Sequence, residues 1–202
     1  MDAPSTGARP VRSFVAIEIE EPARGAIVAY LAELRGRVDG VAWTRPENMH
    51  LTLKFLGGVA PERLTTLAER LAAIAGAERP FVVAYRGVGA FPSAGRPQVL
   101  WVGAAASELA PIAAAVDEAA SVAGVARELR PFHPHVTLGR MRPGRRARGT
   151  DRSGTSPRAV LAVDAERAFG VAVASALVLF RSDTNATGAR HTPLARLAFG
   201  YE

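Results

Sequence analysis

Two short words of nearly the same residues, His50-Leu51-Thr52-Leu53 and His135-Val136-Thr137-Leu138, carry the side chains most able to do chemistry. Each word alternates polar and apolar residues, so on a β-strand its His and Thr side chains point to the same face, about 6.6 Å apart. If the two strands lie side by side, two imidazoles and two hydroxyls meet on one small surface. Because histidine titrates at about pH 6.5, one ring can accept a proton while the other, next to a phosphate anion, donates one without any metal. The hydroxyls of Thr52 and Thr137 can hold phosphate oxygens.

Other side chains that carry charge or titrate fall near these words. Arg140 stands five residues after His135 and is the arginine best placed by sequence to offset charge on a phosphate. Lys54, the chain's only lysine, has the same parity as the first word and can line a cleft, but we expect it at the solvated rim. We expect His133 to be a neighbour of the site and His191 to be a turn or surface residue.

Ordinary structural roles and a metal site are the alternatives for these residues. A single His-x-Thr word is common in strands and by itself indicates only structure, whereas two matched words in a chain with four histidines favour a shared site. His133 and His135 flank Pro134 in a pattern that can bind metal. Zinc sites, however, need three or four ligands, and the chain has no cysteine and no His-Glu-x-x-His pattern. We therefore expect no metal and no cofactor.

The composition is that of a folded chain of modest size. Its 202 residues, 49% of them hydrophobic, can bury a substantial core in one domain or in two closely packed lobes. The absence of cysteine removes disulfide and thiolate chemistry and fits a reducing compartment, so we expect the cytoplasm. Residues 1–10 show no signal-peptide pattern, and no apolar run approaches the roughly 18 residues of a membrane span. We expect a flexible leader over 1–10, a single bilobal domain over 11–202, and a monomer.

The balance of charge favours a polyanionic partner without identifying it. Lysine and arginine number 25 against 19 acidic residues, for a net charge of +6 and a pI of about 10.8. Arginines crowd into the stretch that begins at Arg140. Residues 142–157 are rich in Gly, Arg and Ser, which is typical of a long mobile loop and suggests a lid or binding segment. A solvated loop in an arginine-rich chain is an equally good interpretation.

Hydrophobic periodicity predicts mixed α and β structure. Alternating residues predict strands over 12–19, near 43, and over 49–55, 81–85, 99–102, 134–140, 176–182 and 193–199. Apolar residues at helical spacing predict helices after Pro22, from about Pro61, over 107–122 and, briefly, over 158–167. Because strands and helices mix without a strict βαβ rhythm, we expect an α+β fold with mainly antiparallel sheet in two similar lobes.

Extended versions of the two words resemble the signature motifs of a known family. Residues 46–57 (PENMHLTLKFLG) and 132–140 (FHPHVTLGR) are similar to the two motifs of the RNA 2′,3′-cyclic phosphodiesterases. That family is also called the 2′-5′ RNA ligase family and belongs to the two-histidine phosphoesterases. Residues 12–17, 99–103 and 177–197 also follow the family's course, so the resemblance covers nearly the whole chain after residue 10.

The resemblance implies a fold and a reaction. The fold is a bilobal α+β structure in which two mainly antiparallel sheets flank a central cleft, with helices on the outside and the two words on the cleft floor. The reaction is metal-independent hydrolysis of a terminal 2′,3′-cyclic phosphate on RNA to a 2′-phosphate, with 2′-5′ ligation as its reverse. His135 would accept a proton from water, and His50 would donate one to the departing 3′ oxygen. Thr52, Thr137 and Arg140 would bind the phosphate.

Two departures from the family and two alternative functions accompany this prediction. His191 stands where the family favours an aromatic residue such as Tyr, and segment 142–157 is richer in Arg and Gly than usual, so the shape of the rim and the details of the substrate stay open. A small cyclic nucleotide or an ADP-ribose-type cyclic phosphate is the alternative substrate. A non-catalytic RNA-binding module is the alternative class, and the intact histidine in both words argues against it.

Overall fold

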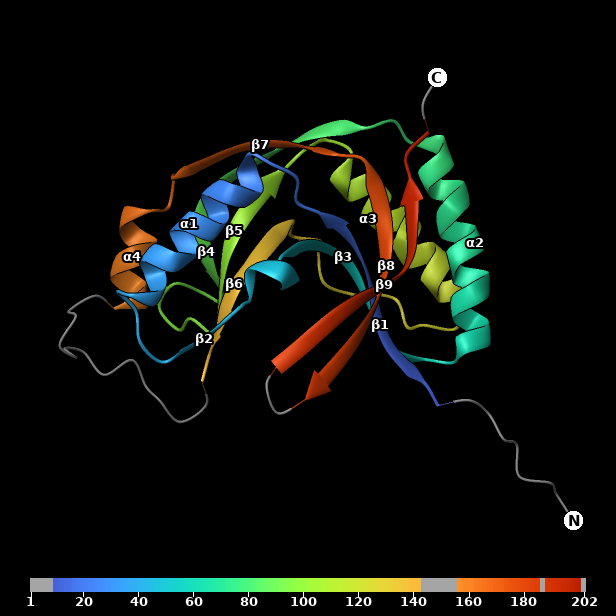
Figure 1. Ribbon diagram of the computed structural model, residues 1–202, viewed down its shortest axis with the longest axis horizontal. Coiled ribbons are helices and arrows are strands. Elements are labelled where there is room, and N and C mark those ends of the chain that lie inside the picture. The colour runs from blue at the N-terminus through green and yellow to red at the C-terminus, as the bar shows by residue number, and fades with distance from the viewer. Residues whose placement is uncertain (1–8, 143–155, 186–187, 201–202) are drawn as a thin grey trace, which may run out of the picture.

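The computed structural model describes residues 9–142, 156–185 and 188–200 (Figure 1). Almost all of the leader predicted over 1–10 and of the loop predicted over 142–157 lies outside the described residues. The elements are, in order, β1 (Val11–Glu18), α1 (Ala23–Arg35), β2 (Val41–Trp43), the 3₁₀ turn η1 (Pro46–Asn48), β3 (His50–Val59), α2 (Pro61–Ala77), β4 (Phe81–Phe91), β5 (Val99–Ala105), α3 (Leu109–Val122), β6 (His135–Met141), α4 (Pro157–Val163), β7 (Ala168–Ala174), β8 (Ala176–Asn185) and β9 (Gly188–Ala198).

The described strands form one antiparallel sheet with two halves. The order is β7-β4-β5-β6-β3-β1-β8-β9, and β2 pairs with residues 139–141 at the end of β6. Between the halves, β3 and β6 are paired through a single residue pair, Leu51 and Val136. The predicted α+β class and antiparallel pairing are confirmed. The two sheets that the family resemblance implies are the two halves of this sheet, and they are continuous through the pair of Leu51 and Val136.

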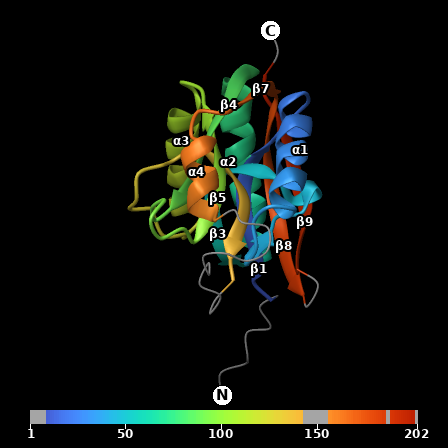
Figure 2. The ribbon, with the colours of Figure 1, turned by 90° about the vertical axis from the view of Figure 1, so that its left-hand side faces the viewer.

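Each half of the sheet is covered by two helices. α1 contacts β7 and α4 contacts β4, whereas α2 and α3 cover β3, β8 and β9, so the two helix pairs lie at opposite ends of the molecule (Figures 1 and 2). α2 begins with Pro61 in its first turn, where the missing N–H costs nothing. Leu64, Leu67, Leu71 and Ala75 are buried because their spacing brings them to one side of the helix. None of the helices in the described ranges is long and apolar enough to cross a membrane.

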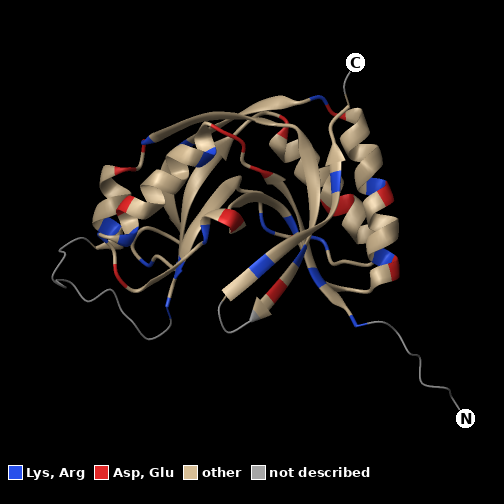
Figure 3. Ribbon diagram, in the orientation of Figure 1, with Lys and Arg blue, Asp and Glu red and all other residues tan. Residues whose placement is uncertain are grey.

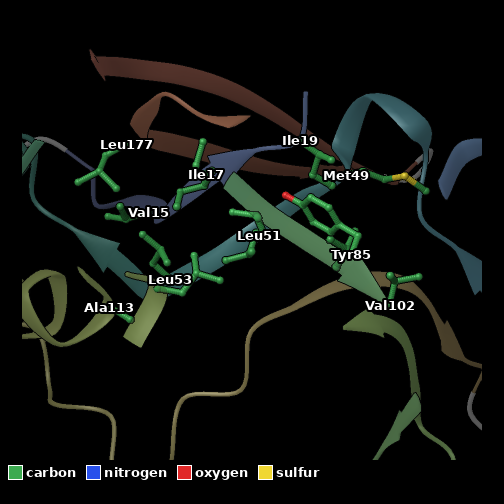
Figure 4. Packing of buried hydrophobic residues seen from close by; sticks show 14 of the residues in the cluster. Val15, Ile17, Ile19, Met49, Leu51, Leu53, Tyr85, Val102, Ala113 and Leu177 are labelled. Atoms are coloured by element: carbon green, nitrogen blue, oxygen red, sulfur yellow. The ribbon is translucent and has the colours of Figure 1, made fainter. Parts of the chain in front are cut away.

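The main hydrophobic core lies between the sheet and its helices. Leu51 and Val136, at the junction of the two halves, have no exposed surface. Val15, Ile17 and Leu53 pack around Leu51 in the same cluster (Figure 4). Because side chains alternate along a strand, the residues between these core positions point away from the helices. We call that opposite side of the sheet the site face; it carries His50, Thr52, His135 and Thr137.

The largest differences between the structure and the predicted elements are in β4, β7 and β9. β7 was not predicted because Ala168–Ala174 (AFGVAVA) is a short apolar run, which periodicity does not distinguish from a buried helix segment. β4 continues six residues beyond the predicted end at residue 85, as far as Phe91. β9 begins at Gly188, five residues before the strand predicted over 193–199. The earlier start of β9 brings an additional histidine into the sheet.

Candidate active site

The two His-x-Thr words begin two neighbouring strands. His50 is the first residue of β3, and His135 is the first residue of β6. The antiparallel pair that joins these strands places His50 opposite Thr137 and Thr52 opposite His135. Directly opposite Cβ atoms in such strands are about 5 Å apart, and diagonal neighbours about 7–8 Å. The two imidazoles therefore occupy one diagonal of a four-residue cluster, a spacing that suits groups acting on opposite sides of one phosphate.

A β-bulge on β6 brings Arg140 to the site face. Thr137 pairs with Trp101 of β5, but the next pair on β6 uses Gly139, so Leu138 is the extra residue. Because a bulge adds one residue to the alternation, Arg140 lies on the same face as the histidine word. Gly139 is required here, since a Cβ at this position would lie 2.6 Å from a methyl group of β2. The arginine that sequence spacing singled out is thus turned toward the cluster.

A matching bulge on β3 turns Lys54 the other way. Leu53 is the extra residue, so Lys54 joins it on the helix side and Phe55 takes the position on the site face. Lys54 is buried, donates a hydrogen bond to the carbonyl of Ala126 at 2.7 Å and pairs with Asp117 at 2.5 Å. The prediction of a solvated rim residue is wrong, because strict alternation along β3 was assumed.

An aromatic cluster holds the ring of His50. The ring stacks on Phe14, with 4.5 Å between centroids and 25° between planes, and Phe14 in turn stacks on Phe180 at 5.1 Å. His191 stands edge-on to both rings, 5.4 Å from His50 and 4.9 Å from Phe14. A hydrogen bond to the backbone of Asn48 fixes His50 further. These contacts hold the imidazole from one face, from its edge and through one ring nitrogen.

His135 is held in a similar way in the other half. Its Nδ1 lies 2.7 Å from the carbonyl oxygen of His133, and because a carbonyl only accepts, Nδ1 carries the hydrogen. Phe91 stands edge-on to the ring at 5.0 Å, and Trp101 is 6.4 Å away. Trp101 lies flat over Gly89, where a Cβ would be 2.1 Å from the indole. With Nδ1 occupied, Nε2 is the nitrogen of neutral His135 that can accept a proton.

Both imidazoles favour the uncharged state in the free protein. Burial lowers the pKa of His50 to about 4, and the neighbouring charge of His191 acts in the same direction. Burial also lowers the pKa of His135, with further contributions from His133 and Arg140, against the hydrogen bond to the His133 carbonyl. At neutral pH each ring is therefore ready to accept a proton, and a bound anion is needed to keep one of them protonated.

Comparison with known proteins places this arrangement in a family. A family model described as LigT like phosphoesterase matches residues 17–101. A protein of Archaeoglobus fulgidus named RNA 2′,3′-cyclic phosphodiesterase is 39% identical over 133 residues, covering 65% of this chain and 73% of that protein. The chain belongs to the LigT-like phosphoesterase family.

Further relatives and solved structures agree with the family. A protein of Aeropyrum pernix, also named RNA 2′,3′-cyclic phosphodiesterase, is 41% identical over 128 residues, covering 59% of this chain and 70% of that protein. A crystal structure from Thermus thermophilus covers 95% of this chain and all of its own, with a TM-score of 0.76 and 26% identity. Ligand-free Escherichia coli LigT, at 24% identity over 96% of this chain and all of its own, shares the fold with a TM-score of 0.74.

His191, like Lys54, is a residue of this LigT-like phosphoesterase that sequence reasoning misplaced. The prediction of a turn or surface position is wrong, because His191 lies within β9 opposite Ser182 and is partly buried against the His50 cluster. Its Nδ1 is buried and has no hydrogen-bond partner among the described residues. Arg190 and Thr192, on either side, are exposed. The side chains of residues 188–192 alternate between exposed and partly buried, which is what a strand that begins before residue 193 predicts.

The donors gathered on the site face define the chemistry that it can perform. They are two imidazoles, two threonine hydroxyls and the guanidinium of Arg140. Within residues 9–142, 156–185 and 188–200 there is no group of three or more histidine or acidic side chains arranged to hold a metal ion. His133, the predicted neighbour, takes part through its carbonyl oxygen and packs its ring on Trp101 at 4.9 Å. The set fits acid-base transfer around an anion.

Proposed function

We propose that this LigT-like phosphoesterase hydrolyses the 2′,3′-cyclic phosphate at the end of an RNA and leaves a 2′-phosphate. The observation that carries the proposal is the four-residue cluster on β3 and β6, in which each imidazole lies beside the threonine of the other word. Two relatives that share 39% and 41% identity with the chain are named RNA 2′,3′-cyclic phosphodiesterase. Escherichia coli LigT, 25% identical, has been crystallised with 3′-AMP, which supports a nucleotide end as the ligand.

The reaction uses the two imidazoles as base and acid. Nε2 of His135 takes a proton from a water molecule while the water oxygen attacks phosphorus. The bond between phosphorus and the 3′ oxygen breaks, and His50 gives its proton to that oxygen. The products are a 2′-phosphate and a free 3′-hydroxyl. Ligation, in which a 5′-hydroxyl attacks phosphorus in place of water, breaks the same bond to the 3′ oxygen and forms a 2′-5′ bond. His135 then takes the proton of the 5′-hydroxyl, and His50 again protonates the 3′ oxygen.

In the free protein His135 is already in the uncharged form that a base needs, whereas His50 takes up its proton when substrate binds. Burial lowers the pKa of His135, and the charge of Arg140 adds to this effect, which keeps the base unprotonated and available. His50 needs a proton to act as the acid, whereas burial lowers its pKa to about 4 in the free protein. A cyclic phosphate bound next to the ring supplies the negative charge that restores the proton. His50 is therefore protonated only when a substrate, with its leaving 3′ oxygen, is bound.

Thr52, Thr137 and Arg140 bind the phosphate in this proposal. The two hydroxyls lie beside the imidazoles and can donate to the non-bridging oxygens, and the guanidinium offsets the charge that accumulates in the transition state. Since these donors sit on strands of the rigid sheet, they need little rearrangement when the charge develops. We propose that this chemistry requires no metal ion.

The test is hydrolysis of an RNA oligonucleotide that ends in a 2′,3′-cyclic phosphate, in excess chelator. We expect a product that co-elutes with a synthetic 2′-phosphate standard and is separated from the 3′-phosphate isomer. A 3′-phosphate product, or activity that is lost in chelator and returns with a divalent cation, would contradict the proposal. Binding of the RNA without turnover would instead support the non-catalytic module.

A further inference from the structure

Phe55 is exposed on the site face close to the proposed acid. Its side chain is 60% exposed, and it is the one aromatic residue among the exposed large hydrophobic residues of the described chain. Its ring centroid is 6.1 Å from that of Phe14, which in turn stacks on the ring of His50 at 4.5 Å. One aromatic ring therefore separates Phe55 from the reacting centre. A nucleotide next to the one that carries the cyclic phosphate can reach it.

The two halves of the sheet place different side chains at the first site-face position after the bulge. After the bulge on β6, the first residue on the site face is Arg140, which is near enough to His135 for its charge to act on the imidazole. After the bulge on β3, the corresponding residue is Phe55. The site face thus offers a cation on one side of the cluster and an exposed aromatic ring on the other.

A hollow opens beside Phe55 along the edge of β3. It has a volume of about 340 Å³ and is lined by residues 55–60, Arg63 and residues 123–126. β6 pairs with β3 only at the junction of the halves, so this edge of β3 is not covered by a strand in the described structure. The guanidinium of Arg63 reaches across the hollow, since a Cβ on Gly124 would lie 2.6 Å from it.

Two exposed arginines flank the ring of Phe55. Arg12 of β1 lies opposite Gly58, which lines the hollow. Because Arg12 is two residues before Phe14, both side chains point to the site face. Arg12 and Arg63 are both exposed, and neither forms an ion pair within the described part of the chain. Basic positions appear on β1 and in the first turn of α2 (Figure 3). An aromatic platform between cations is the combination that binds single-stranded nucleic acid, since the base stacks and the cations meet the phosphates.

We propose that Phe55, Arg12 and Arg63 form a subsite for the nucleotide that precedes the cyclic-phosphate end of an RNA. The base of that nucleotide stacks on Phe55, and its phosphate lies between the two guanidinium groups. This inference rests on the proposed function and specifies its substrate class as RNA chains of two or more nucleotides. A mononucleoside 2′,3′-cyclic phosphate has neither the second base nor the second phosphate, so it gains nothing from the subsite.

The experiment compares kcat/KM for a trinucleotide and for a mononucleoside, both ending in a 2′,3′-cyclic phosphate. We expect the unmodified protein to prefer the trinucleotide, and Phe55→Ser to reduce that preference by about tenfold with the mononucleoside rate unchanged. Phe55→Trp should retain the preference. Arg63→Gln should weaken the trinucleotide alone and make its KM less sensitive to salt. Arg70→Gln, which removes an exposed arginine two turns further along α2, is the matched control and should change neither rate.

The outcomes separate the subsite from the proposed function. No hydrolysis of either substrate by the unmodified protein would refute the function itself. Intact hydrolysis with an unchanged preference in Phe55→Ser, or an equal loss on both substrates, would refute the subsite alone. Because Phe55 is exposed, we expect the thermal unfolding midpoint of the variants to match that of the unmodified protein, which confirms that they are folded.

Discussion

Acidification should destabilise the protein through His50. Its ring is buried against Phe14, which lowers its pKa to about 4, whereas an unfolded chain has an ordinary histidine with a pKa of about 6.5. The unfolded state therefore takes up a proton at higher pH than the folded state. The stability that comes from this difference is complete above about pH 6.5 and is lost as the pH falls toward 4.

The size of the effect follows from the two pKa values of His50. A pKa difference of about 2.5 corresponds to a limit of about 3 kcal/mol. Proton linkage places about 2 kcal/mol of this loss between pH 7 and pH 5, where carboxylates still carry most of their charge. A loss of that size is a large part of the stability of a domain, so urea unfolding resolves it.

The assay compares the unmodified protein with His50→Asn in urea at pH 7 and at pH 5. The asparagine keeps an N–H donor for the backbone of Asn48 but does not titrate. His135 and His191 are present in both proteins, so their contributions largely cancel. We expect the unmodified protein to lose about 2 kcal/mol more than the variant. Equal losses in the two proteins, or an NMR titration of the His50 ring centred near pH 6.5, would refute the reasoning.

Three further substitutions test the role of Arg140 and the packing of the strands that carry the site. Arg140→Gln should reduce kcat/KM for the cyclic phosphate by about 10- to 100-fold and raise the pKa of His135, so that the acidic limb of the pH profile moves to higher pH. Lys54→Met should lower the free energy of unfolding by about 2–4 kcal/mol because Asp117 loses its buried partner, and adding Asp117→Leu should restore most of the loss in urea unfolding. Gly139→Ala should cost about 1–3 kcal/mol because its Cβ meets β2; an unfolding midpoint equal to that of the unmodified protein would show that β2 gives way.

Local patterns were sufficient to predict the helices and the strands that carry the two histidine words. The apolar residues of α2 recur at helical spacing, and each word alternates over four residues, so these signals need no knowledge of distant contacts. The pairing of the words followed from their similarity and was confirmed by the register of β3 and β6. Arg140 was chosen by its distance along the chain, and the bulge at Leu138 is what turns it to the site face.

The remaining features depend on contacts between segments that are far apart in sequence. The bulge on β3 is visible only against β1, so alternation assigned Lys54 to the wrong side of the strand and gave no sign that Phe55 faces the site. His191 approaches His50 because β8 and β9 pair along their whole length, which composition does not indicate. β7 is a short apolar run whose partner, β4, lies some 85 residues earlier in the chain.

The central claim is that two imidazoles act together on one phosphorus atom, and single-turnover hydrolysis by His50→Asn, His135→Asn and the double variant tests it most directly. We predict that each single substitution lowers the rate at least about 100-fold, with circular dichroism showing an intact fold. The double variant should lose much less than the product of the two single effects, since the residues work as a unit. A folded variant that lacks either imidazole and retains its rate would contradict the claim.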